Sequence, residues 1–362
     1  MNKTIVEYFD ELKKKKKSLT FSILLHDNPD PDALACGMGV RFLLESFGHN
    51  SQIFWHGELT HIQNRILYNV LKIDAIKTNS QQAEIIEEKS KGSKIIVVDS
   101  SNPLGTGNMT GIGSFFSGRS RDLVIDHHSG CCEEGVYFNK NHGSCSTTVY
   151  ELIKSYGLEI NRTLATAFII GIDSDTDNLR KKGTTETDKE IRDELMEKID
   201  PEKYLRIINY PKPVSTICLR SNIYSSLKKE GDIAFCNSGI ILPEQRSLVA
   251  EIADEILRIE TIKHCCIISI INPGENQKKA LSVSFRNTGD VIDTNDFMKA
   301  VFGPEFGGRE GSGGGSTNLD DTLSLMIDKA LFDENKNSLK NLLDLIGSTY
   351  FSKVVSEKAK IS

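Results

Sequence analysis

The sequence predicts an α/β protein in which an N-terminal domain built on a parallel sheet is followed by a helical linker and a smaller α/β domain. The 362 residues exceed the size of one compact core, since domains usually hold about 100 to 200 residues. Two regions of the chain show alternating strand-like and helix-like apolar patterns, and a charged, proline-containing stretch separates them. With 38% hydrophobic and 26% charged residues, the composition is that of a globular protein and argues against wholesale disorder.

The first half alternates strands and helices. Continuous apolar runs, which are typical of parallel strands covered on both faces, occur at residues 21–26, 51–57, 94–100 and 122–128. Apolar residues recur at helical spacing from Asp32 to Phe47, and Gly48 follows where a helix C-cap is expected. Further helices are predicted at 144–157, which opens with hydroxyl caps, and at 161–172. Such β-α-β alternation predicts a parallel sheet.

The second half repeats the alternation after a break. Residues 186–228 are charged, helical in period and interrupted by three prolines, so we interpret them as a helical linker. Strands are then predicted at 233–241, 264–271 and 279–287, with a helix at 244–260. A glycine-rich stretch, 302–318, leads into an apolar helix that begins near Leu319. The predicted division is an N-terminal α/β domain at 1–185, the linker at 186–228 and a second α/β domain at 229–350.

Charge and apolar content limit the functions that the chain can have. Forty-four Lys+Arg against fifty Asp+Glu give a net charge of −6, which excludes a broadly basic nucleic-acid coat. No apolar run approaches the ~18 residues of a membrane span, and the N-terminus lacks the pattern of a secretory signal. The eight cysteines are never spaced CxxC and are interpreted as buried, reduced thiols. We therefore expect a cytoplasmic protein with no membrane partner, and we interpret the lysine run 13–17 as a solvated surface.

Acidic and histidine side chains follow three of the predicted strands. In an open α/β sheet, ligands bind beyond the carboxyl ends of the strands, so these side chains are expected to converge. A further acidic group, Asp173, Asp175 and Asp177, comes just after the predicted helix 161–172. The residues at or just after the ends of these strands are His26, Asp30, Asp32, Asp99, Asp126, His127 and His128.

Convergent carboxylates repel one another unless a cation neutralises them. Oxygen and imidazole ligands without thiolate suit Mn²⁺ better than structural zinc, and a carboxylate that bridges two ions is typical of two-metal phosphoryl transfer. A purely structural explanation exists for each motif. Asp30 or Asp32 could simply cap a helix, Asp126 with its two histidines could form a buried hydrogen-bonded trio, and the acidic stretch at 173–177 could be a solvated loop.

The motifs HDNPDPDA, VVDSS, IDHH and GIDSDT, in this order, resemble the four motifs of the DHH phosphoesterase family over roughly residues 20–180. This family includes RecJ-type exonucleases, nanoRNases with pAp phosphatase activity, cyclic-di-AMP phosphodiesterases and family II inorganic pyrophosphatases. The resemblance implies two divalent ions, with Mn²⁺ as the best match. One ion would be held by His26, Asp30, Asp99 and Asp175, and the other by Asp32, Asp99 and His127, with Asp99 as the bridge. It also implies that Asp126 orients an imidazole and that His128 stabilises charge on the phosphoryl group.

The second half carries a further resemblance. GGREGSGG (307–314) is similar to the glycine-rich signature of the DHH-associated C-terminal domain, and SVSFRN (282–287) to its strand with a substrate-facing arginine. Many members of the family have histidine where this chain has Arg309, which exchanges a titratable donor for a permanent charge. A flexible loop and an ordinary surface arginine are the structural explanations that compete with this one. The implied substrate-binding residues are Arg286, Gly307, Gly308, Arg309, Gly313 and Gly314.

The leading hypothesis is a phosphodiesterase or oligoribonuclease that hydrolyses short oligonucleotides, dinucleotides or related nucleotide phosphoesters with a metal-activated water. A RecJ-like single-strand exonuclease would need a long basic groove and stacking aromatics, which 7% aromatic residues and a charge of −6 do not supply. Hydrolysis of pyrophosphate or polyphosphate and non-catalytic nucleotide sensing are further candidate functions. The expected partner is a short oligonucleotide or nucleotide substrate, and a homodimer is left open.

Overall fold

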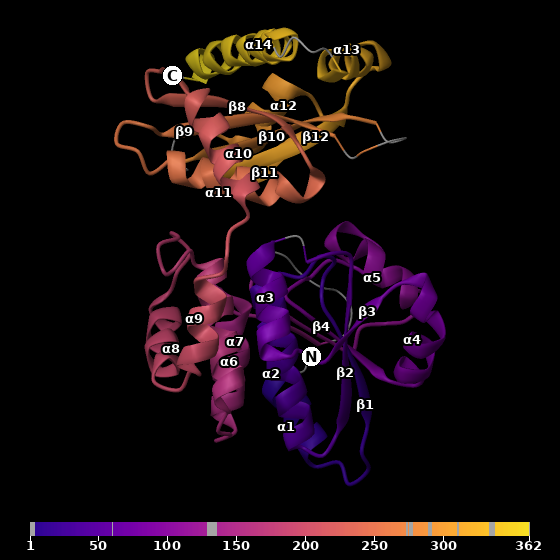
Figure 1. The fold of residues 1–362 in the computed structure, drawn as a ribbon. Coiled ribbons are helices and arrows are strands. Elements are labelled where there is room, and N and C mark those ends of the chain that lie inside the picture. Colours follow the sequence, from indigo (N-terminus) through magenta and orange to yellow (C-terminus); the bar gives the residue numbers. More distant parts are fainter. Residues whose placement is uncertain are drawn as a thin grey trace. The chain divides into compact units, whose positions relative to one another are not determined.

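The computed structural model describes residues 4–59, 61–128, 136–272, 274, 278–288, 292–309, 311–332 and 337–361. The chain divides into two compact units, Met1–Tyr210 and Pro211–Ser362, each with its own sheet (Figure 1). The segment 186–228, predicted to be a helical linker, contains α8 (Glu186–Met196) and α9 (Pro201–Ile208) in the first unit and α10 (Val214–Ser225) in the second.

The first unit is built on a six-stranded sheet in the order β3-β2-β1-β4-β5-β6, with every neighbouring pair parallel. This confirms the predicted parallel α/β fold. Four of the strands lie where the apolar runs placed them, whereas β3 and β6 are short and were not predicted. The strands are β1 (Thr20–Leu24), β2 (Asn50–His56), β3 (Ala75–Thr78), β4 (Lys94–Val98), β5 (Leu123–Asp126) and β6 (Val136–Asn139).

Helices cover both faces of this sheet because successive strand residues point to opposite sides. Ile23 and Ile96 belong to a large core with α2, α6 and α7, while Leu24 and Val97 pack in a smaller core with α4 and α5 (Figure 1). Continuous apolar strands are therefore buried on both faces, as the sequence predicts. The helices are α1 (Ile5–Lys13), α2 (Pro31–Ser46), α3 (Ile62–Leu71), α4 (Ala83–Ser90), α5 (Thr110–Phe115), α6 (Cys145–Ser155) and α7 (Arg162–Asp175), with 3₁₀ turns at η1 (Ser80–Gln82) and η2 (Gly107–Met109).

The second unit has a mixed sheet in the order β11-β12-β10-β9-β8-β7, in which only the β8–β9 pair is parallel among the described strands. One face packs on α10 and α11 through residues such as Ala234 and Ile267, and the other on α12 and α14 through Phe235 and Phe285. The strands are β7 (Lys228–Glu230), β8 (Ile233–Ile241), β9 (His264–Ile271), β10 (Ala280–Asn287), β11 (Phe306–Arg309) and β12 (Ser312–Asn318). The remaining elements are η3 (Pro243–Gln245), α11 (Arg246–Ile256), α12 (Thr294–Phe302), α13 (Asp321–Phe332) and α14 (Asn337–Ile361).

The glycine-rich stretch forms the strands β11 and β12 and is therefore not a flexible loop. Close packing explains why several positions of this stretch are occupied by glycine. A Cβ on Gly313 would lie 2.7 Å from Thr294 Cγ2 and 2.8 Å from Met298 Cγ, both on α12, and a Cβ on Gly308 would lie 2.6 Å from the Ser312 carbonyl oxygen. Only glycine lets this hairpin approach α12 so closely.

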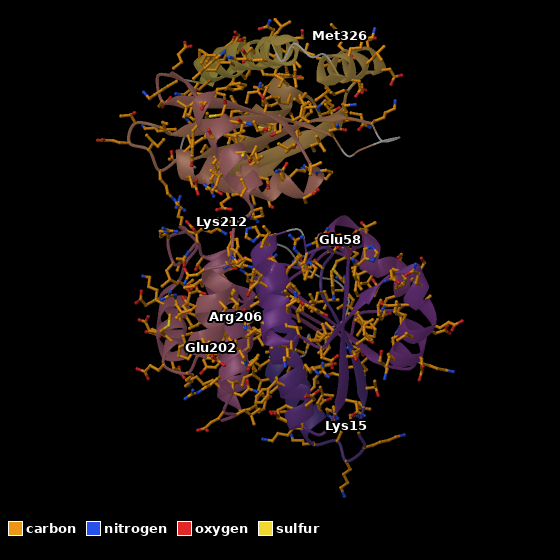
Figure 2. All side chains as sticks on the ribbon, in the orientation of Figure 1. Lys15, Glu58, Glu202, Arg206, Lys212 and Met326 are labelled. Carbon is orange, nitrogen blue, oxygen red and sulfur yellow. The ribbon has the colours of Figure 1, made fainter. Side chains whose placement is uncertain are left out.

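The structure agrees with the interpretation of the lysine run, and with that of the described cysteines except at Cys218. Lys13 to Lys17 are all exposed, and Figure 2 shows Lys15 projecting away from the ribbon of the first unit. The six cysteines that the structure describes are free, and five of them are buried; Cys218 is exposed, and Cys131 and Cys132 lie outside the described residues. Within the described part of the chain, no helix combines the length and apolarity that crossing a membrane requires.

The close contact of α2 with α6 and α7 can be tested by a substitution at Gly39. A Cβ there would lie 2.5 Å from Phe168 Cζ and 2.7 Å from Val149 Cγ1. Alanine gains about 1 kcal/mol of helix propensity over glycine, but overpacking a buried contact costs about 1–3 kcal/mol, and here two side chains are in the way. We expect Gly39→Ala to lower the free energy of unfolding by about 1–2 kcal/mol in urea denaturation. Gly183→Ala is the control, because nothing lies within 4 Å of the added Cβ; equal stability of the two variants would contradict this account of the packing.

Candidate metal centre

The predicted acidic and histidine residues meet at the carboxyl ends of three neighbouring strands. The strand order reverses between β1 and β4, and in open α/β sheets ligands bind at such a point. His26, Asp30 and Asp32 follow β1, Asp99 follows β4, and His127 follows β5. Asp175 joins them as the last residue of α7, which runs three residues beyond its predicted end at 172. The structure therefore brings together all six residues that were predicted to bind metal.

Asp99 lies at the centre of this cluster, with its side chain 1% exposed. Its Oδ2 is 3.7 Å from His26 Nε2, and its Oδ1 is 3.4 Å from His127 Nε2. The two carboxylate oxygens thus face different imidazoles, which is the arrangement expected of a carboxylate that bridges two cations.

Among the residues that the structure describes, three overlapping groups of ligand atoms have the spacing of a metal site, each with its atoms within 4.8 Å of one another. Asp99 belongs to two of them. Asp175 lies with Asp32 and His127, its Oδ2 being 3.1 Å from His127 Nε2, rather than with His26 and Asp30 as the family resemblance implied. The groups are His26, Asp30 and Asp99; Asp32, His127 and Asp175; and Asp99, His127 and His128.

Backbone carbonyl groups fix the orientation of both central imidazoles. His26 Nδ1 is 2.9 Å from the carbonyl oxygen of Asp27, and His127 Nδ1 is 3.1 Å from that of His142. A carbonyl oxygen only accepts, so each Nδ1 carries the hydrogen and each Nε2 faces the cluster. Histidine ligands are commonly oriented in this way by a second hydrogen bond.

Two of the three carboxylates of HDNPDPDA, those of Asp30 and Asp32, are held by helix N-termini. Asp30 caps α2 by accepting a hydrogen bond from the Ala33 amide at 3.0 Å, so it combines the capping role with its place in the cluster. Asp32 is fully buried and accepts hydrogen bonds from the amides of Cys145 and Ser146, the first residues of α6, at 2.7 and 2.8 Å. No motif in the sequence pointed to this contact, although the Ser144 hydroxyl cap marked the start of the helix.

Asp126 and His128 form a pair beside the cluster. Asp126 is fully buried, and its Oδ1 accepts hydrogen bonds from the His127 and His128 amides and from His128 Nδ1, the last at 2.9 Å. The His128 side chain is 41% exposed. Asp126 therefore orients the imidazole of His128, and His128 is the member of the motif that solvent reaches most easily.

The charges of the cluster shift the pKa values of its members. Burial, together with the charge of Asp175, raises the pKa of Asp32 to about 7, and burial and the charge of Asp32 raise the pKa of Asp99 well above its usual range. Burial alone would lower the pKa of His26, but hydrogen bonding and charge from Asp30 raise it to about 10; Asp175 and Asp99 likewise raise the pKa of His127. Without a cation, the cluster therefore retains protons to balance its carboxylates.

These donors fit divalent metal ions. Among the described residues, Asp99 Oδ1 and His127 Nε2 are buried atoms without a hydrogen-bond partner. The nearby thiols do not change the donor set, because burial raises the pKa of Cys145 to about 11 and leaves it as a neutral thiol. Carboxylate and imidazole donors without thiolate match Mn²⁺.

The other two acidic residues of the stretch 173–177 have different partners. Asp173 accepts hydrogen bonds from Arg192 on α8, at 2.5 Å to Nε. Asp177 pairs with Arg180 at 2.9 Å. Neither belongs to a group with metal-ligand spacing within the described residues.

Five of the six predicted substrate-binding residues, all except Gly307, line one pocket of about 400 Å³ in the second unit: Arg286, Gly308, Arg309, Gly313 and Gly314, together with Ser312. Arg309 is exposed, whereas Arg286 is 19% exposed and donates to Asp254 at 2.8 Å. A neighbouring pocket shares Arg286 and extends to Arg246 and Ser247 at the start of α11.

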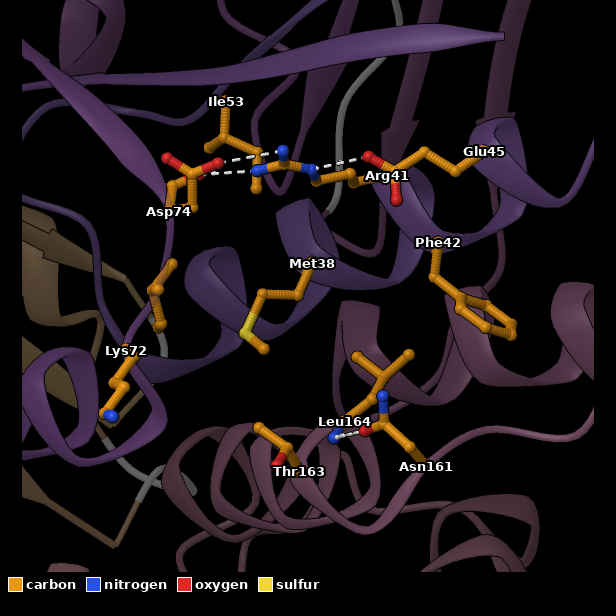
Figure 3. Close-up of a pocket in the computed structure, with 11 residues that line it drawn as sticks. Met38, Arg41, Phe42, Glu45, Ile53, Lys72, Asp74, Asn161, Thr163 and Leu164 are labelled. Atoms are coloured by element: carbon orange, nitrogen blue, oxygen red, sulfur yellow. Dashed lines mark hydrogen bonds and ion pairs between the residues drawn. The ribbon is translucent and has the colours of Figure 1, made fainter. Parts of the chain in front are cut away.

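A pocket of about 190 Å³ in the first unit contains none of the predicted site residues (Figure 3). It lies beside α2 and the start of α7, with Met38 near its centre. Arg41 on its rim donates to Glu45 and to Asp74, so the guanidinium charge is already paired. We assign this pocket no role.

Comparison with known proteins supports the assignment of the first unit. Residues 20–172 match the model of the DHH family, N-terminal domain. This stretch of the chain, which includes β1 to β6 and five of the six clustered ligands, is therefore a DHH-family N-terminal domain.

Two curated proteins are similar in sequence. An uncharacterized protein of Methanocaldococcus jannaschii is 25% identical over 342 residues, which cover 92% of this chain and 64% of the relative. A protein of Lactiplantibacillus plantarum named as a probable manganese-dependent inorganic pyrophosphatase is 25% identical over 194 residues, 52% of this chain and 58% of the relative. The chain thus spans less than two thirds of the length of either protein.

A solved structure shares the fold of nearly the whole chain. The crystal structure of an exopolyphosphatase-related protein from Bacteroides fragilis aligns with a TM-score of 0.68 at 17% identity, covering 94% of this chain and 96% of that protein. At this identity the likeness concerns the fold alone.

Replacing Asp99 should disable the whole cluster. Asparagine is the suitable variant because it keeps the size of the side chain and tolerates the left-handed backbone of this residue, at φ +59°. We expect Asp99→Asn to lose Mn²⁺ stoichiometry and activity together, and to lose more than His26→Ala, since His26 belongs to only one of the three groups found among the described residues. Equilibrium dialysis with metal analysis would measure this. Asp99→Asn with two bound Mn²⁺ ions per chain, or with half the wild-type rate, would refute the bridging role.

Metal affinity should increase with pH. Metal ions bind neutral imidazole and ionised carboxylate, whereas the pKa values of His26, about 10, and Asp32, about 7, mean that the metal-free cluster holds protons at neutral pH. Each proton released on binding strengthens Mn²⁺ affinity about tenfold per pH unit. Titration calorimetry between about pH 6 and pH 8, in buffers of different ionisation enthalpy, would give both the affinity and the proton count. An affinity that stays constant over this range would contradict the assignment.

Proposed function

We propose that this protein is a metal-dependent phosphoesterase that hydrolyses short oligonucleotides, dinucleotides or related small nucleotide phosphoesters, with two divalent ions, Mn²⁺ being the best match. The observation that carries the proposal is the buried Asp99 carboxylate, whose two oxygens face the imidazoles of two different ligand groups. The DHH-family match of residues 20–172 supports the same class of reaction.

The proposed chemistry assigns a role to each part of the cluster. Two divalent ions bound at such a site would supply a water molecule of lowered pKa for attack on phosphorus and would offset the charge of the phosphoryl group. His26, Asp30 and Asp99 would hold one ion. Asp32, His127 and Asp175 would hold the other, together with Asp99.

His128 is placed to act on the substrate instead. Its Nδ1 donates to the buried Asp126, which fixes the ring, while the side chain remains 41% exposed. When protonated, the ring presents a second N–H at Nε2, which can donate to a phosphoryl oxygen as negative charge develops there.

The second unit supplies a candidate site for the rest of the substrate. Its pocket carries Arg309 and Arg286, and a guanidinium can bind phosphate through two parallel hydrogen bonds. A nucleotide substrate with a second phosphate has a group for this pocket to bind, which is why we favour dinucleotides and short oligonucleotides over pyrophosphate.

Hydrolysis of pyrophosphate or polyphosphate is the second candidate. The similarity to the Lactiplantibacillus plantarum protein, whose name describes a manganese-dependent inorganic pyrophosphatase, favours it. A single-strand exonuclease of the RecJ type and a non-catalytic nucleotide sensor are the third and fourth candidates. The presence of all six ligand residues in one cluster argues against the sensor.

A turnover panel with Mn²⁺ separates these functions. We expect hydrolysis of a linear dinucleotide, pAp or a cyclic dinucleotide to exceed that of pyrophosphate, polyphosphate and long single-stranded DNA. Preferred turnover of pyrophosphate or polyphosphate would establish the second candidate, and processive degradation of long DNA would establish the exonuclease.

Arg309→Ala should separate phosphate binding from metal chemistry. Losing a charged hydrogen bond to phosphate costs roughly 1.5–3 kcal/mol, or about tenfold to a hundredfold, and we expect it in KM for a dinucleotide. Hydrolysis of bis-p-nitrophenyl phosphate should stay near the wild-type rate, because this ester has no second phosphate. Arg258→Ala, at an exposed arginine of the same unit that lines neither of the two pockets there, is the matched control. An equal loss on both substrates would place Arg309 at the reacting phosphorus.

A further inference from the structure

We propose that Asp188, on α8, is a positioning residue for the metal centre, because it holds the segment 142–146 that orients both Asp32 and His127. The inference rests on the proposed metal centre. Asp188 lies in the stretch that the sequence presented as a charged linker. Its hydrogen bonds within the described part of the chain go to residues outside the six-residue cluster.

The segment 142–146 contacts two ligands through its backbone. The carbonyl oxygen of His142 accepts from His127 Nδ1 at 3.1 Å and so directs Nε2 toward the cluster. The amides of Cys145 and Ser146 donate to Asp32 Oδ2 and Oδ1 at 2.7 and 2.8 Å. A displacement of this segment would therefore disturb two members of one ligand group together.

Asp188 fixes the segment from the other side. It is fully buried, and its carboxylate accepts hydrogen bonds from the Gly143 amide at 2.8 Å and from the Thr147 hydroxyl at 2.6 Å. The amide and the hydroxyl of Thr185, the N-cap of α8, donate to it at 2.7 Å each. The carboxylate thus ties the start of α8 to Gly143, just before α6, and to Thr147 in the first turn of α6.

Close packing makes this tie sensitive to change. A Cβ on Gly143 would lie 2.9 Å from Asp188 Oδ2 and 2.7 Å from Thr176 Cγ2, so the backbone rests directly against the carboxylate. The four groups that bond to the Asp188 carboxylate all donate hydrogen. Asparagine has the same shape, but its NH₂ group would face donors and leave at least one of them without an acceptor.

If Asp188 only stabilised the fold, its replacement would affect the metal centre no more than an equally destabilising change elsewhere on α8. Glu194 offers such a change. Glu194 lies on the same helix and joins it to α6 by accepting from Tyr150 at 2.8 Å and Lys154 at 2.6 Å, without a described contact to residues 142–146. If α8 only stabilises the fold, Glu194→Gln and Asp188→Asn should affect the metal centre in proportion to their effects on stability.

The experiment compares wild type, Asp188→Asn, Glu194→Gln and Thr147→Val in three measurements: thermal stability, Mn²⁺ affinity by titration calorimetry, and hydrogen exchange of peptides covering 142–147 in the metal-free protein. We expect Asp188→Asn to weaken Mn²⁺ binding about 10- to 100-fold, the usual effect of removing a group that orients a metal ligand. We also expect faster exchange of the Cys145 and Ser146 amides. Glu194→Gln should leave both properties at wild-type values even where it lowers stability.

Each outcome decides the inference. Wild-type affinity and exchange in folded Asp188→Asn would overturn it, as would equal changes in Glu194→Gln. If Asp188→Asn does not fold, Thr147→Val decides, because it removes one of the four hydrogen bonds: a several-fold weaker affinity with faster exchange supports the role, and unchanged values refute it. If the wild type binds no Mn²⁺, the proposed function fails, while exchange in the metal-free variants still shows whether Asp188 holds the segment.

Discussion

The buried carboxylate of Asp99, between the imidazoles of His26 and His127, is the interaction on which the first unit depends. Several carboxylates brought together in a buried site cannot all be ionised unless positive charge compensates them. The fold creates this situation, because the reversal of strand order between β1 and β4 places the ends of both strands side by side. Asp99 itself adopts a left-handed backbone conformation, with its amide still bonded to Ile125 of β5 at 2.8 Å. Such a conformation costs about 1–2 kcal/mol outside glycine, so the surrounding structure must hold it in place.

The helices around the sheet contribute unequal electrostatic effects to this site. The N-termini of α2 and α6 direct amide groups at Asp30 and Asp32, which stabilises their negative charge. Asp175 lies at the C-terminal end of α7, where the helix dipole disfavours a carboxylate by about 0.3–1 kcal/mol. This placement is unfavourable for an isolated carboxylate and becomes favourable once a cation is bound beside it. The arrangement of Asp175 is therefore easier to explain by metal binding than by protein stability.

The sequence predicted the convergence of these residues because most of the motifs sit at the end of a strand that its apolar run already identified. Residues at the ends of neighbouring strands converge when the strands run parallel, and β-α-β alternation predicts parallel strands. The grouping of Asp175 with Asp32 and His127 was harder to predict, since it depends on how far α7 extends. The strands β3 and β6 are only partly buried, unlike the equally short and fully buried β5, so burial did not require a continuous apolar run in either.

Contacts made by backbone atoms, such as the His142 carbonyl and the Cys145 amide, place no requirement on residue type and leave no mark in the sequence. Asp188 was hidden for a related reason: a charged residue in a polar helix is normally solvated, and only the tertiary fold shows that it is fully buried.

The glycine-rich hairpin of the second unit has a different role from that of a glycine-rich phosphate-binding loop. Glycine-rich loops bind phosphate through free backbone amides, but β12 has pairing partners on both sides, β10 and β11, which occupy its amides. The glycines instead allow close packing on α12 and keep the pocket beside Arg309 free of side chains. The amides of β12 are therefore not available to an anion, which leaves side chains and the edge strand β11 to recognise one. Arg286 is already paired with Asp254, so Arg309 is the exposed cation of this pocket within the described residues. A histidine at this position would be charged only at acidic pH, so the exchange to arginine makes the positive charge of the pocket permanent.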